Sequence, residues 1–599
     1  MVREAKKKFE RKLAKEIKKK PKQFYAYLKS RTSNRQPVGP LKDDDQVISD
    51  NTGMANVLNK FFSSVFTDED TNNIPEVTSY NFREELNEVE VDEMNIEGKI
   101  KGLRPGGAGG PDKITTRLLK ETGDILCVPL AILFKRSLDE GVVPEDWRKA
   151  NVTPIFKKGS RMLPGNYRPV SLTCIICKLM ESIVRDSIVS HLAENELILS
   201  SQHGFTFSKS CQTNLLEYLN TLTKLVDEGF NVDVLYLDFA KAFDKVPHQR
   251  LLKKLQAHGI CGKVLGWISS WLSDRKQRVV LNGSVSEWLD VTSGVPQGSV
   301  LGPTCFVIFI NDIDEVLDLV EGFVYKFADD TKYGRVIASE RDREEMQGNI
   351  DRLMEWAEKW QMDFNTTKCK LIHFGSTNNR CTYTMGGYAP GGTILESVVE
   401  EKDIGVIIHQ SLKPSVQCLK AAKTANSVLG QMRRSVLYRD KVVWVKLYKT
   451  FVRPHLECSV QAWSPWLKKD ISVLEKVQQR AVNMVVGLEG LEYEEKLKKL
   501  NLLSLVDRRL RGDVIQVWKW FNGLSLMDRS MFSLVSDQHL RATRHTSKPF
   551  NLVKPKARLD IRRHSFSSRC VELWNSLPSR IQGLNNIDEF KAAYDDFMG

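Results

Sequence analysis

The sequence has 599 residues and a mass of 68.3 kDa, too long for a single hydrophobic core, so we expect several domains. Its formal net charge of +13 at pH 7 favours a polyanionic partner without identifying which one. The sequence lacks an apolar run of membrane-spanning length, and its 11 cysteines form no regular framework. These features argue against a membrane partner and a disulfide-stapled secreted domain, and predict a soluble intracellular protein.

The first 95 residues are predicted to form a basic, largely helical extension. Lysines interspersed with glutamates over residues 1–22 indicate a helix with little apolar face. Such a helix is as compatible with a solvated surface as with a nucleic-acid contact. From Phe24 to Phe66 apolar residues recur at helical spacing, so this part is expected to pack on the main body.

Two short motifs are interpreted as structural. The glycine-rich loop at residues 104–112 is followed by no Gly-Lys-Ser/Thr, so it is not a P-loop. We predict a flexible connection into a helix over residues 114–122. Cys174 and Cys177 form a CxxC with no second pair at zinc-ligand spacing, which predicts buried thiols and no metal site.

Two strand-like segments, residues 152–159 and 166–172, carry cations and flank a turn that contains Pro164 and Gly165. Lys157 could reach a nucleotide phosphate as a point charge, and Arg168 as a fork of donors. Taken alone, each of them is more often a surface cation.

The segment 232–238 has the pattern of a buried strand that ends on Asp238. A charged side chain in this place is poorly suited to packing and well suited to a site at the end of the strand. Asp238 is therefore a candidate metal ligand. Helices over residues 249–257, ended by Gly259, and over residues 263–272 are predicted to follow.

A loop of sequence Ser-Gly-Val-Pro-Gln-Gly begins at residue 293 and leads into an apolar helix expected to run to Leu317. Its glycines allow a close approach of the backbone to a ligand, and Gln297 offers an amide to a base or sugar. From this loop alone, a helix start with glycine flexibility is the commoner explanation.

The adjacent residues Asp329 and Asp330 carry the strongest chemical signal. An aromatic and apolar run precedes them and the strand-like run 333–337 follows, which predicts a β-hairpin with both aspartates at its tip. Neighbouring carboxylates repel each other unless a cation lies between them. A pair of Mg²⁺ ions held in this way can clamp the attacking and leaving oxygens of a phosphoryl transfer. An isolated Asp-Asp is most often a solvated turn, so the choice between a turn and a metal site depends on the other motifs.

Basic residues also mark the last third of the chain. Helical spacing over residues 412–437 and 473–486 predicts two helices whose cations either contact duplex phosphates or face solvent. Cations with interleaved aromatics gather between residues 541 and 569, in a stretch expected to be sheet or loop, where they suit a single strand. The candidate nucleic-acid-binding residues are Lys420, Lys423, Arg433, Arg434, Arg558, Arg562 and Arg563.

In this order, the motifs resemble the reverse transcriptase of non-LTR (LINE-type) retrotransposons, in particular the jockey and chicken-repeat group. Order and spacing fit from about residue 95 to 520, and Asn365, Lys368-Cys369-Lys370 and Asp403-Ile404-Gly405-Val406 continue the series. The carrying motifs are Asn-Tyr-Arg-Pro-Val-Ser-Leu (166–172), Gln-His-Gly-Phe (202–205), Leu-Asp-Phe-Ala-Lys-Ala-Phe-Asp (237–244), Gly-Val-Pro-Gln-Gly-Ser-Val-Leu-Gly-Pro (294–303) and Phe-Ala-Asp-Asp (327–330).

The resemblance implies an α+β, right-hand polymerase whose palm is a small antiparallel sheet. It also implies an RNA-directed DNA polymerase that extends a DNA 3′-hydroxyl on an RNA template with dNTPs. Two Mg²⁺ ions, with Mn²⁺ as a substitute, would serve as cofactors, and target-primed retrotransposition would place the protein in the nucleus and cytoplasm. The implied parts are a basic helical N-terminal extension (1–95), fingers with the start of the palm (96–230), palm (231–400), helical thumb (401–510) and a basic C-terminal segment (511–599).

The same resemblance assigns roles to individual residues. Asp238, Asp329 and Asp330 would be the catalytic, metal-binding carboxylates. Lys368 or Lys370 would help to protonate the departing pyrophosphate, and Lys368 is the residue assigned here. Residues expected to bind the dNTP are Lys157, Arg168, Phe239, Phe243, Gln297 and Gly298, with Phe243 excluding a ribose 2′-hydroxyl.

Some features depart from the family. Residues 206–209 and 403–406 differ from its pattern, in the regions of template contact and primer grip. Full-length relatives carry an endonuclease before the polymerase, and the chain leaves no room for one, so that activity is expected from elsewhere. The alternatives are a catalytically silent or domesticated nucleic-acid-binding remnant and an RNA-dependent RNA polymerase. The intact carboxylates and Phe243 favour the reverse transcriptase.

Overall fold

The computed structural model describes residues 1–16, 23–24, 26–27, 38–386, 392–436, 438–537 and 549–598. The chain has separate helical and sheet regions, which confirms the predicted α+β class. Within these ranges, no helix is both long and apolar enough to span a membrane. The division at residues 95, 230, 400 and 510 stays a prediction; below, fingers, palm and thumb name the groups of elements given with each, and the fingers group also includes α3 of the N-terminal extension and the strands β6 to β8. Three of the predicted C-terminal cations, Arg541, Arg544 and Lys548, lie outside the described residues.

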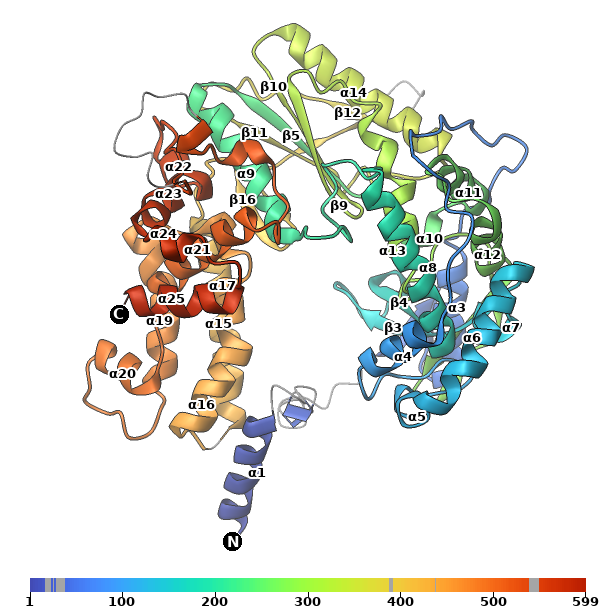
Figure 1. Cartoon of the computed structure of the whole chain (residues 1–599), viewed down its shortest axis with the longest axis horizontal. Coiled ribbons are helices and arrows are strands. Elements are labelled where there is room, and N and C mark those ends of the chain that lie inside the picture. Colours follow the sequence, from blue (N-terminus) through green and yellow to red (C-terminus); the bar gives the residue numbers. More distant parts are fainter. Residues whose placement is uncertain are drawn as a thin grey trace.

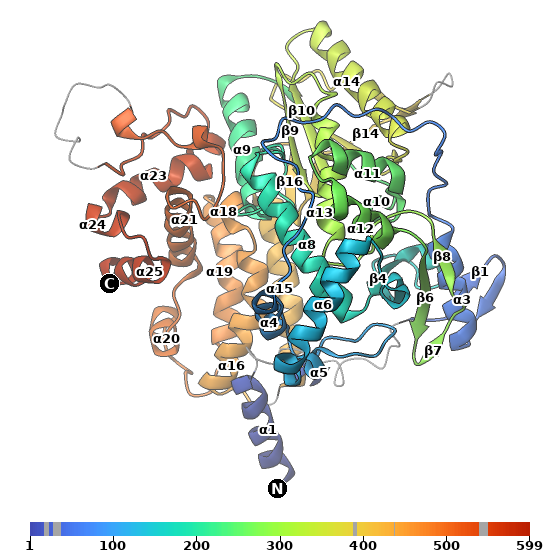
Figure 2. The same cartoon turned by 45° about the vertical axis from the view of Figure 1, so that its right-hand side comes forward.

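The fingers contain a sheet of order β4-β3-β6-β7, in which β8 also pairs with β6. The two cation-bearing segments form an antiparallel hairpin, as predicted, and Ile155 lies opposite Arg168 in it. Helix α3 packs beside this sheet (Figure 2) and buries Leu58 and Phe62 against Val152. The elements are α3 (Asn51–Ser63), β3 (Lys149–Phe156), the turn η1 (Pro164–Asn166), β4 (Tyr167–Leu172), β6 (Arg275–Leu281), β7 (Ser284–Val285) and β8 (Leu289–Val291), with a separate hairpin of β1 (Leu41–Asp43) and β2 (Gln46–Ile48).

Helices complete the fingers. The predicted helix 114–122 is confirmed as α5. The loop before it is exposed over residues 104–108, and only its end is packed: a β-carbon at Gly110 would lie 2.6 Å from the backbone nitrogen of Cys174. Cys174 and Cys177 are buried free thiols, as expected. The helices are α4 (Glu93–Gly102), α5 (Thr116–Glu121), α6 (Gly123–Glu140), α7 (Glu145–Arg148), α8 (Ile175–Glu194) and α9 (Cys211–Glu228).

The palm is a sheet of order β14-β11-β5-β10-β9, at the top of Figure 1 between the fingers and the thumb. Strand β5 is buried along its whole length, as its apolar run predicted. Because side chains alternate across a strand, Leu235 packs in the core with Trp356 of α14 while Val234 packs in the core with Tyr218 of α9. The palm elements are β5 (Val232–Leu237), β9 (Gly322–Phe327), β10 (Asp330–Val336), α14 (Glu340–Lys359), β11 (Lys370–Phe374), β14 (Glu396–Ser397) and a small hairpin of β12 (Thr384–Met385) and β13 (Thr393–Ile394).

The helices after β5 are α10 (Ala242–Lys245), α11 (His248–Ala257) and α12 (Gly262–Leu272), close to the predicted ranges, and Gly259 has a left-handed φ of 77°. The apolar helix after the glycine loop, α13 (Gly302–Phe309), ends earlier than predicted. Buried Lys254 donates a hydrogen bond of 2.6 Å to the Phe309 carbonyl, and Lys326 donates one of 3.0 Å to the Asn311 carbonyl. These long-range bonds draw the chain into the 3₁₀ turn η2 (Asn311–Asp314).

The thumb is helical, as predicted, and stands at the left of Figure 1. A β-hairpin joins it to the palm, and its two long helices α15 and α19 pack on each other. The elements are β15 (Glu400–Asp403), β16 (Val406–His409), α15 (Ser415–Ser435), α16 (Lys441–Leu447), the π-helical turn η3 (Tyr448–Val452), α17 (Pro454–Glu457), α18 (Val460–Trp463), α19 (Lys468–Val482) and α20 (Tyr493–Leu500).

The C-terminal segment is helical from residue 560, and the predicted sheet or loop is wrong there. Trp518, Trp574 and Phe590 form its aromatic core, so these helices have a buried face that the count of cations did not reveal. The elements are α21 (Leu505–Phe521), η4 (Arg529–Met531), η5 (Val535–Asp537), α22 (Asp560–Arg563), α23 (Phe566–Ser576), α24 (Ser579–Gln582) and α25 (Ile587–Met598).

The N-terminal extension touches two parts of the hand. Helix α1 (Val2–Glu16) lies below α16 of the thumb in Figure 1, whereas α3 lies in the fingers. Arg11 pairs with Asp440 at 2.9 Å, and Phe24 stacks on Phe451 with ring centres 5.0 Å apart. The predicted packing of the extension is confirmed, although α1 has more buried contact than its composition suggested.

Candidate active site

The predicted hairpin with its two aspartates is formed by β9 and β10. Phe327 pairs with Asp330, so the turn consists of Ala328 and Asp329, and Ala328 adopts a left-handed φ of 54°. Strand β10 also pairs with β5, where Thr331 lies opposite Leu237. Asp238 comes directly after Leu237, the last residue of β5, and Asp330 directly before Thr331, so both aspartates lie at the same end of the two paired strands. The sheet register therefore brings the three predicted carboxylates together.

The charges of these carboxylates act on one another. Burial raises the pKa of Asp329, and the negative charge of Asp238 raises it further. Burial also raises the pKa of Asp330 to about 6, with contributions from Asp329, Asp403 and Asp238. Carboxylates with raised pKa values at the end of a strand gain from a bound cation, because it removes their mutual repulsion.

The fit of this site to divalent ions depends on donors from outside the chain. In the described parts of the chain, no group of three or more His, Cys, Asp or Glu side chains is close enough to hold a metal ion. Asp238 is instead 3.2 Å from the ammonium of Lys368. Mg²⁺ keeps several waters and binds through one or two carboxylates plus substrate phosphates, so the carboxylate donors here fit that ion once triphosphate oxygens complete the shell.

The Gln-His-Gly-Phe motif holds the tip of the hairpin in place. The side-chain oxygen of buried Gln202 accepts hydrogen bonds from the backbone nitrogens of Ala328 at 2.9 Å and Gly204 at 2.8 Å. A β-carbon on Gly204 would lie only 2.2 Å from the Ala328 nitrogen. From the sequence this motif indicated only the family resemblance, and its structural role was missed; a Gln two residues before a Gly was the available signal.

We expect Gly204→Ala to destabilise the protein by about 1–3 kcal/mol, the usual cost of an overpacked site, and to slow any reaction at the aspartates. The added methyl group has to push the backbone of Ala328, and with it Asp329, out of place. Urea unfolding measures the stability. The matched control is Gly98→Ala in α4, where a β-carbon meets nothing within 4 Å and a helical alanine is favoured. Equal stability of the two variants would contradict this role of Gly204.

A buried ion pair joins the palm to the thumb hairpin. Lys332 of β10 pairs with Asp403 at the end of β15, and its ammonium lies 4.4 Å from the centre of the Tyr218 ring. The turn that follows has left-handed φ values at Ile404 (44°) and Gly405 (94°), as in a two-residue type I′ hairpin. Asp403, which departs from the family pattern, thus ties the β15–β16 hairpin to β10, the strand that begins with Asp330.

The predicted dNTP-binding cations come from the fingers hairpin. Lys157 and Arg168 are both exposed, and their positive charges lower the pKa of Asp329, against the effect of burial. The backbone nitrogen of Lys157 donates to the Asn166 carbonyl at 2.8 Å, which fixes the base of the hairpin turn.

The other predicted dNTP residues surround Ser171 and α10. The Gln297 carbonyl accepts a 2.8 Å bond from the Ser171 nitrogen, and a β-carbon on Gly298 would lie 2.5 Å from the Ser171 oxygen. Phe243 is half-buried and stacks on Phe306, with ring centres 4.5 Å apart. Phe239 is buried and stacks on a palm phenylalanine, so its ring belongs to the core.

The two candidate lysines of the next motif differ in placement. Lys368 contacts Asp238, as described above. Lys370 donates to Glu396 at 2.5 Å and to the Thr367 carbonyl at 2.7 Å, so its ammonium is engaged away from the carboxylates. The structure thus distinguishes between two residues that the sequence left open.

The predicted nucleic-acid-binding cations fall into two sets. On α15, Lys423, Arg433 and Arg434 are exposed and Lys420 is half-buried. Arg562, in contrast, is buried and donates to the Asn220 side chain at 2.8 Å, so a direct contact with a nucleic acid is wrong for this residue. Two neighbours are also engaged: Arg563 with Asp560 at 2.6 Å and Arg558 with the Asp227 carbonyl at 2.9 Å.

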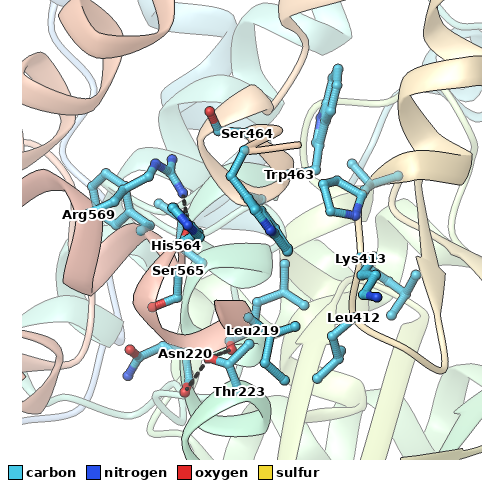
Figure 3. Close-up of a pocket in the computed structure, with 18 of the residues that line it drawn as sticks. Leu219, Asn220, Thr223, Leu412, Lys413, Trp463, Ser464, His564, Ser565 and Arg569 are labelled. Carbon is cyan, nitrogen blue, oxygen red and sulfur yellow. Dashed lines mark hydrogen bonds between the residues drawn. The ribbon is translucent and has the colours of Figure 1, made fainter. Parts of the chain in front are cut away.

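A separate pocket lies where α9, the β16 segment, the end of α18 and the C-terminal helices meet (Figure 3). Its walls include Leu219, Leu412 and Trp463, and Trp466 stacks on His564 with ring centres 5.3 Å apart. The lining contains no carboxylate. This pocket is therefore a joint between α9, the thumb and the C-terminal segment, and it is not part of the acidic site.

Comparisons with known proteins agree with this arrangement. Residues 155–417 match the family model described as "Reverse transcriptase (RNA-dependent DNA polymerase)". The chain is 26% identical over 405 residues to "RNA-directed DNA polymerase from mobile element jockey" of Drosophila funebris, covering 65% of this chain and 43% of that protein. It is 25% identical over 406 residues to the jockey protein of Drosophila melanogaster (65% and 43%) and 25% over 396 residues to "Probable RNA-directed DNA polymerase from transposon X-element" of the same species (64% and 42%). The chain thus spans less than half the length of these curated relatives.

Proposed function

We propose that this chain is an RNA-directed DNA polymerase, because its residues 155–417 match the reverse transcriptase family model and it is similar to the polymerases of jockey elements. It would extend a DNA 3′-hydroxyl on an RNA template with dNTPs. The observation that supports the proposal is that Asp238, directly after the end of β5, and Asp330, at the start of β10, lie at the same end of two paired strands, with Asp329 in the adjoining turn. Target-primed retrotransposition, with an endonuclease supplied from elsewhere and a location in the nucleus and cytoplasm, completes the proposal.

The side chains at the site suit nucleotidyl transfer. Divalent ions, when bound, would neutralise charge at the attacking and leaving oxygens, and the three aspartates would hold them. Lys157 and Arg168 would bind the triphosphate, which fixes the α-phosphate for in-line attack. Lys368, whose ammonium is 3.2 Å from Asp238, would donate a proton to the departing pyrophosphate.

Discrimination against ribonucleotides is proposed for Phe243. Its ring stacks on the ring of Phe306, which is fully buried in the core. A dense core resists displacement, so a 2′-hydroxyl above the ring would meet a rigid surface. We therefore expect dTTP to be preferred to UTP.

The thumb is proposed to hold the template–primer duplex. The cations Lys423, Arg433 and Arg434 stand on the exposed side of α15, while Ala422, Ala425 and Leu429 bury the other side. A helix with this division can lay positive charge along phosphates without losing its packing. The C-terminal cations contribute less to this role, because Arg562 is buried and its guanidinium is hydrogen-bonded to Asn220.

Primer extension tests the proposal. The full chain is incubated with poly(rA), an oligo(dT) primer, Mg²⁺ and dTTP, and elongation of the primer is the expected result. Binding of the primer–template without elongation would contradict the proposed polymerase activity. It would favour the alternative, a catalytically silent nucleic-acid-binding remnant. Incorporation of UTP as readily as dTTP would instead indicate an RNA-dependent RNA polymerase.

We expect primer extension to fall as the pH is lowered through about 6, and added Mg²⁺ to move this decline to lower pH. The fold raises the pKa of Asp330 to about 6, so protons occupy this carboxyl at acidic pH. A metal ion competes with the proton for the same oxygens. The measurement is the rate of dTTP incorporation from about pH 5 to 8 at low and high Mg²⁺. A decline that stays at one pH whatever the Mg²⁺ concentration would contradict this assignment.

A further inference from the structure

Lys241 is a cation of the site to which the sequence analysis gave no role. It follows Asp238 by three residues and has a left-handed φ of 57°. Its backbone carbonyl accepts hydrogen bonds from the backbone nitrogens of Asp244 at 2.8 Å and Lys245 at 3.2 Å. These bonds fix the backbone of Lys241 at the start of α10. In the described part of the chain, no carboxylate oxygen lies within 4.0 Å of that ammonium.

The neighbours of Lys241 are mostly cations. Burial lowers the pKa of Lys241 and the charges of Lys157, Lys368 and Arg168 lower it further, while Asp244 acts in the opposite direction. Lys157 and Arg168 come from the fingers hairpin and Lys368 from the palm, and their charges act on Lys241 in the turn that follows β5. Positive charges gathered in this way repel each other unless a polyanion neutralises them.

An aromatic ring of the N-terminal extension lies against Lys241. The Nζ atom is 5.3 Å from the centre of the Phe61 ring on α3, within the range of a cation–π interaction. The same ring lies 3.2 Å from the position of a β-carbon on Gly165, in the turn of the fingers hairpin. Phe61 therefore touches both Lys241 and the hairpin that carries Lys157 and Arg168.

We propose that Lys241 binds the triphosphate of the incoming nucleotide, and that Phe61 is a positioning residue that holds its ammonium toward the fingers cations. This inference rests on the proposed polymerase function. It also makes α3, which lies outside residues 155–417, a part of the nucleotide site. The contact with the ring restrains the lysine side chain. Because the nearby charges are mostly positive, the partner of its ammonium is the triphosphate.

Binding of dTTP to a stalled complex tests this role without chemistry. The full chain is bound to poly(rA) and an oligo(dT) primer that ends in a dideoxynucleotide, and the Kd of dTTP is measured with Mg²⁺. Lys241→Met, which keeps the aliphatic stem, is expected to raise this Kd about tenfold, as for the loss of a charge-assisted contact. Lys241→Arg is expected to stay close to the wild type because it keeps the charge. An unchanged Kd in Lys241→Met would overturn the proposal.

The role of Phe61 is tested by a double-mutant cycle. Phe61→Leu is expected to raise the Kd about threefold in the wild type and to have no further effect in Lys241→Met, because it acts through the lysine. The matched control Lys60→Ala removes an exposed charge from the same helix and is expected to leave the Kd unchanged. Additive effects of Phe61→Leu and Lys241→Met would overturn the positioning role.

A KM-against-kcat comparison separates this inference from the proposed function. With an extendable primer, Lys241→Met is expected to raise the KM for dTTP more than it lowers kcat. If the wild type does not extend the primer at all, the proposed function fails. If the wild type extends it and Lys241→Met has the same KM, only the role of Lys241 fails.

Discussion

Asp329→Asn is expected to reduce primer extension by at least about a thousandfold, because it removes a charged metal ligand from the reacting centre. The amide keeps the size of the side chain but carries no negative charge. The measurement is the initial rate of dTTP incorporation on poly(rA) with an oligo(dT) primer. Asp45→Asn, in the exposed turn between β1 and β2, is the matched control and is expected to keep full activity.

A second prediction concerns the stability of Asp329→Asn. The fold raises the pKa of Asp329 above its usual value, so the ionised carboxylate disfavours the folded state once the pH exceeds the usual pKa. Removing that charge should leave the protein at least as stable as the wild type near neutral pH. An inactive variant that is also unfolded would therefore point to a structural role, and an active one would end the catalytic assignment.

Asp403→Ala is expected to lower the free energy of unfolding by about 3–5 kcal/mol, the usual result of removing one partner of a buried ion pair. Lys332 is buried, so its ammonium would remain inside the protein without its carboxylate. Urea unfolding at neutral pH measures the loss. Part of it should be regained at alkaline pH, because burial already lowers the pKa of Lys332 and the neutral amine no longer needs a partner.

Two further variants show whether the pair itself is responsible. The double variant Lys332→Met/Asp403→Leu replaces both charges by apolar groups and is expected to be much more stable than Asp403→Ala. Glu121→Ala breaks the exposed pair with Arg117 and should cause little change. If Asp403→Ala were no less stable than Glu121→Ala, the Lys332–Asp403 pair would not anchor the thumb hairpin.

Local patterns predicted much of the palm and fingers. The buried strand β5, the β3–β4 hairpin, and helices α11 and α12 were found close to their predicted ranges, since the spacing of apolar residues reports directly which face of an element is buried. The end of α13 was missed because Lys254 and Lys326, distant in sequence, bind the carbonyls that end it. The C-terminal helices were missed because their charges concealed an aromatic core.

The sequence by itself determined the chemical identity of the site: three carboxylates, a set of cations and an aromatic residue, in an order that resembles one family of polymerases. Only the tertiary structure decided which of these groups lie together. Strand pairing sets Asp238 and Asp330 at the same end of β5 and β10, and packing places Phe61 beside Lys241. Lys370 is bonded to Glu396 whereas Lys368 is not, and Arg562 is buried. The physical reason is that periodicity encodes burial within one element, whereas contacts between elements depend on register and packing across the whole chain.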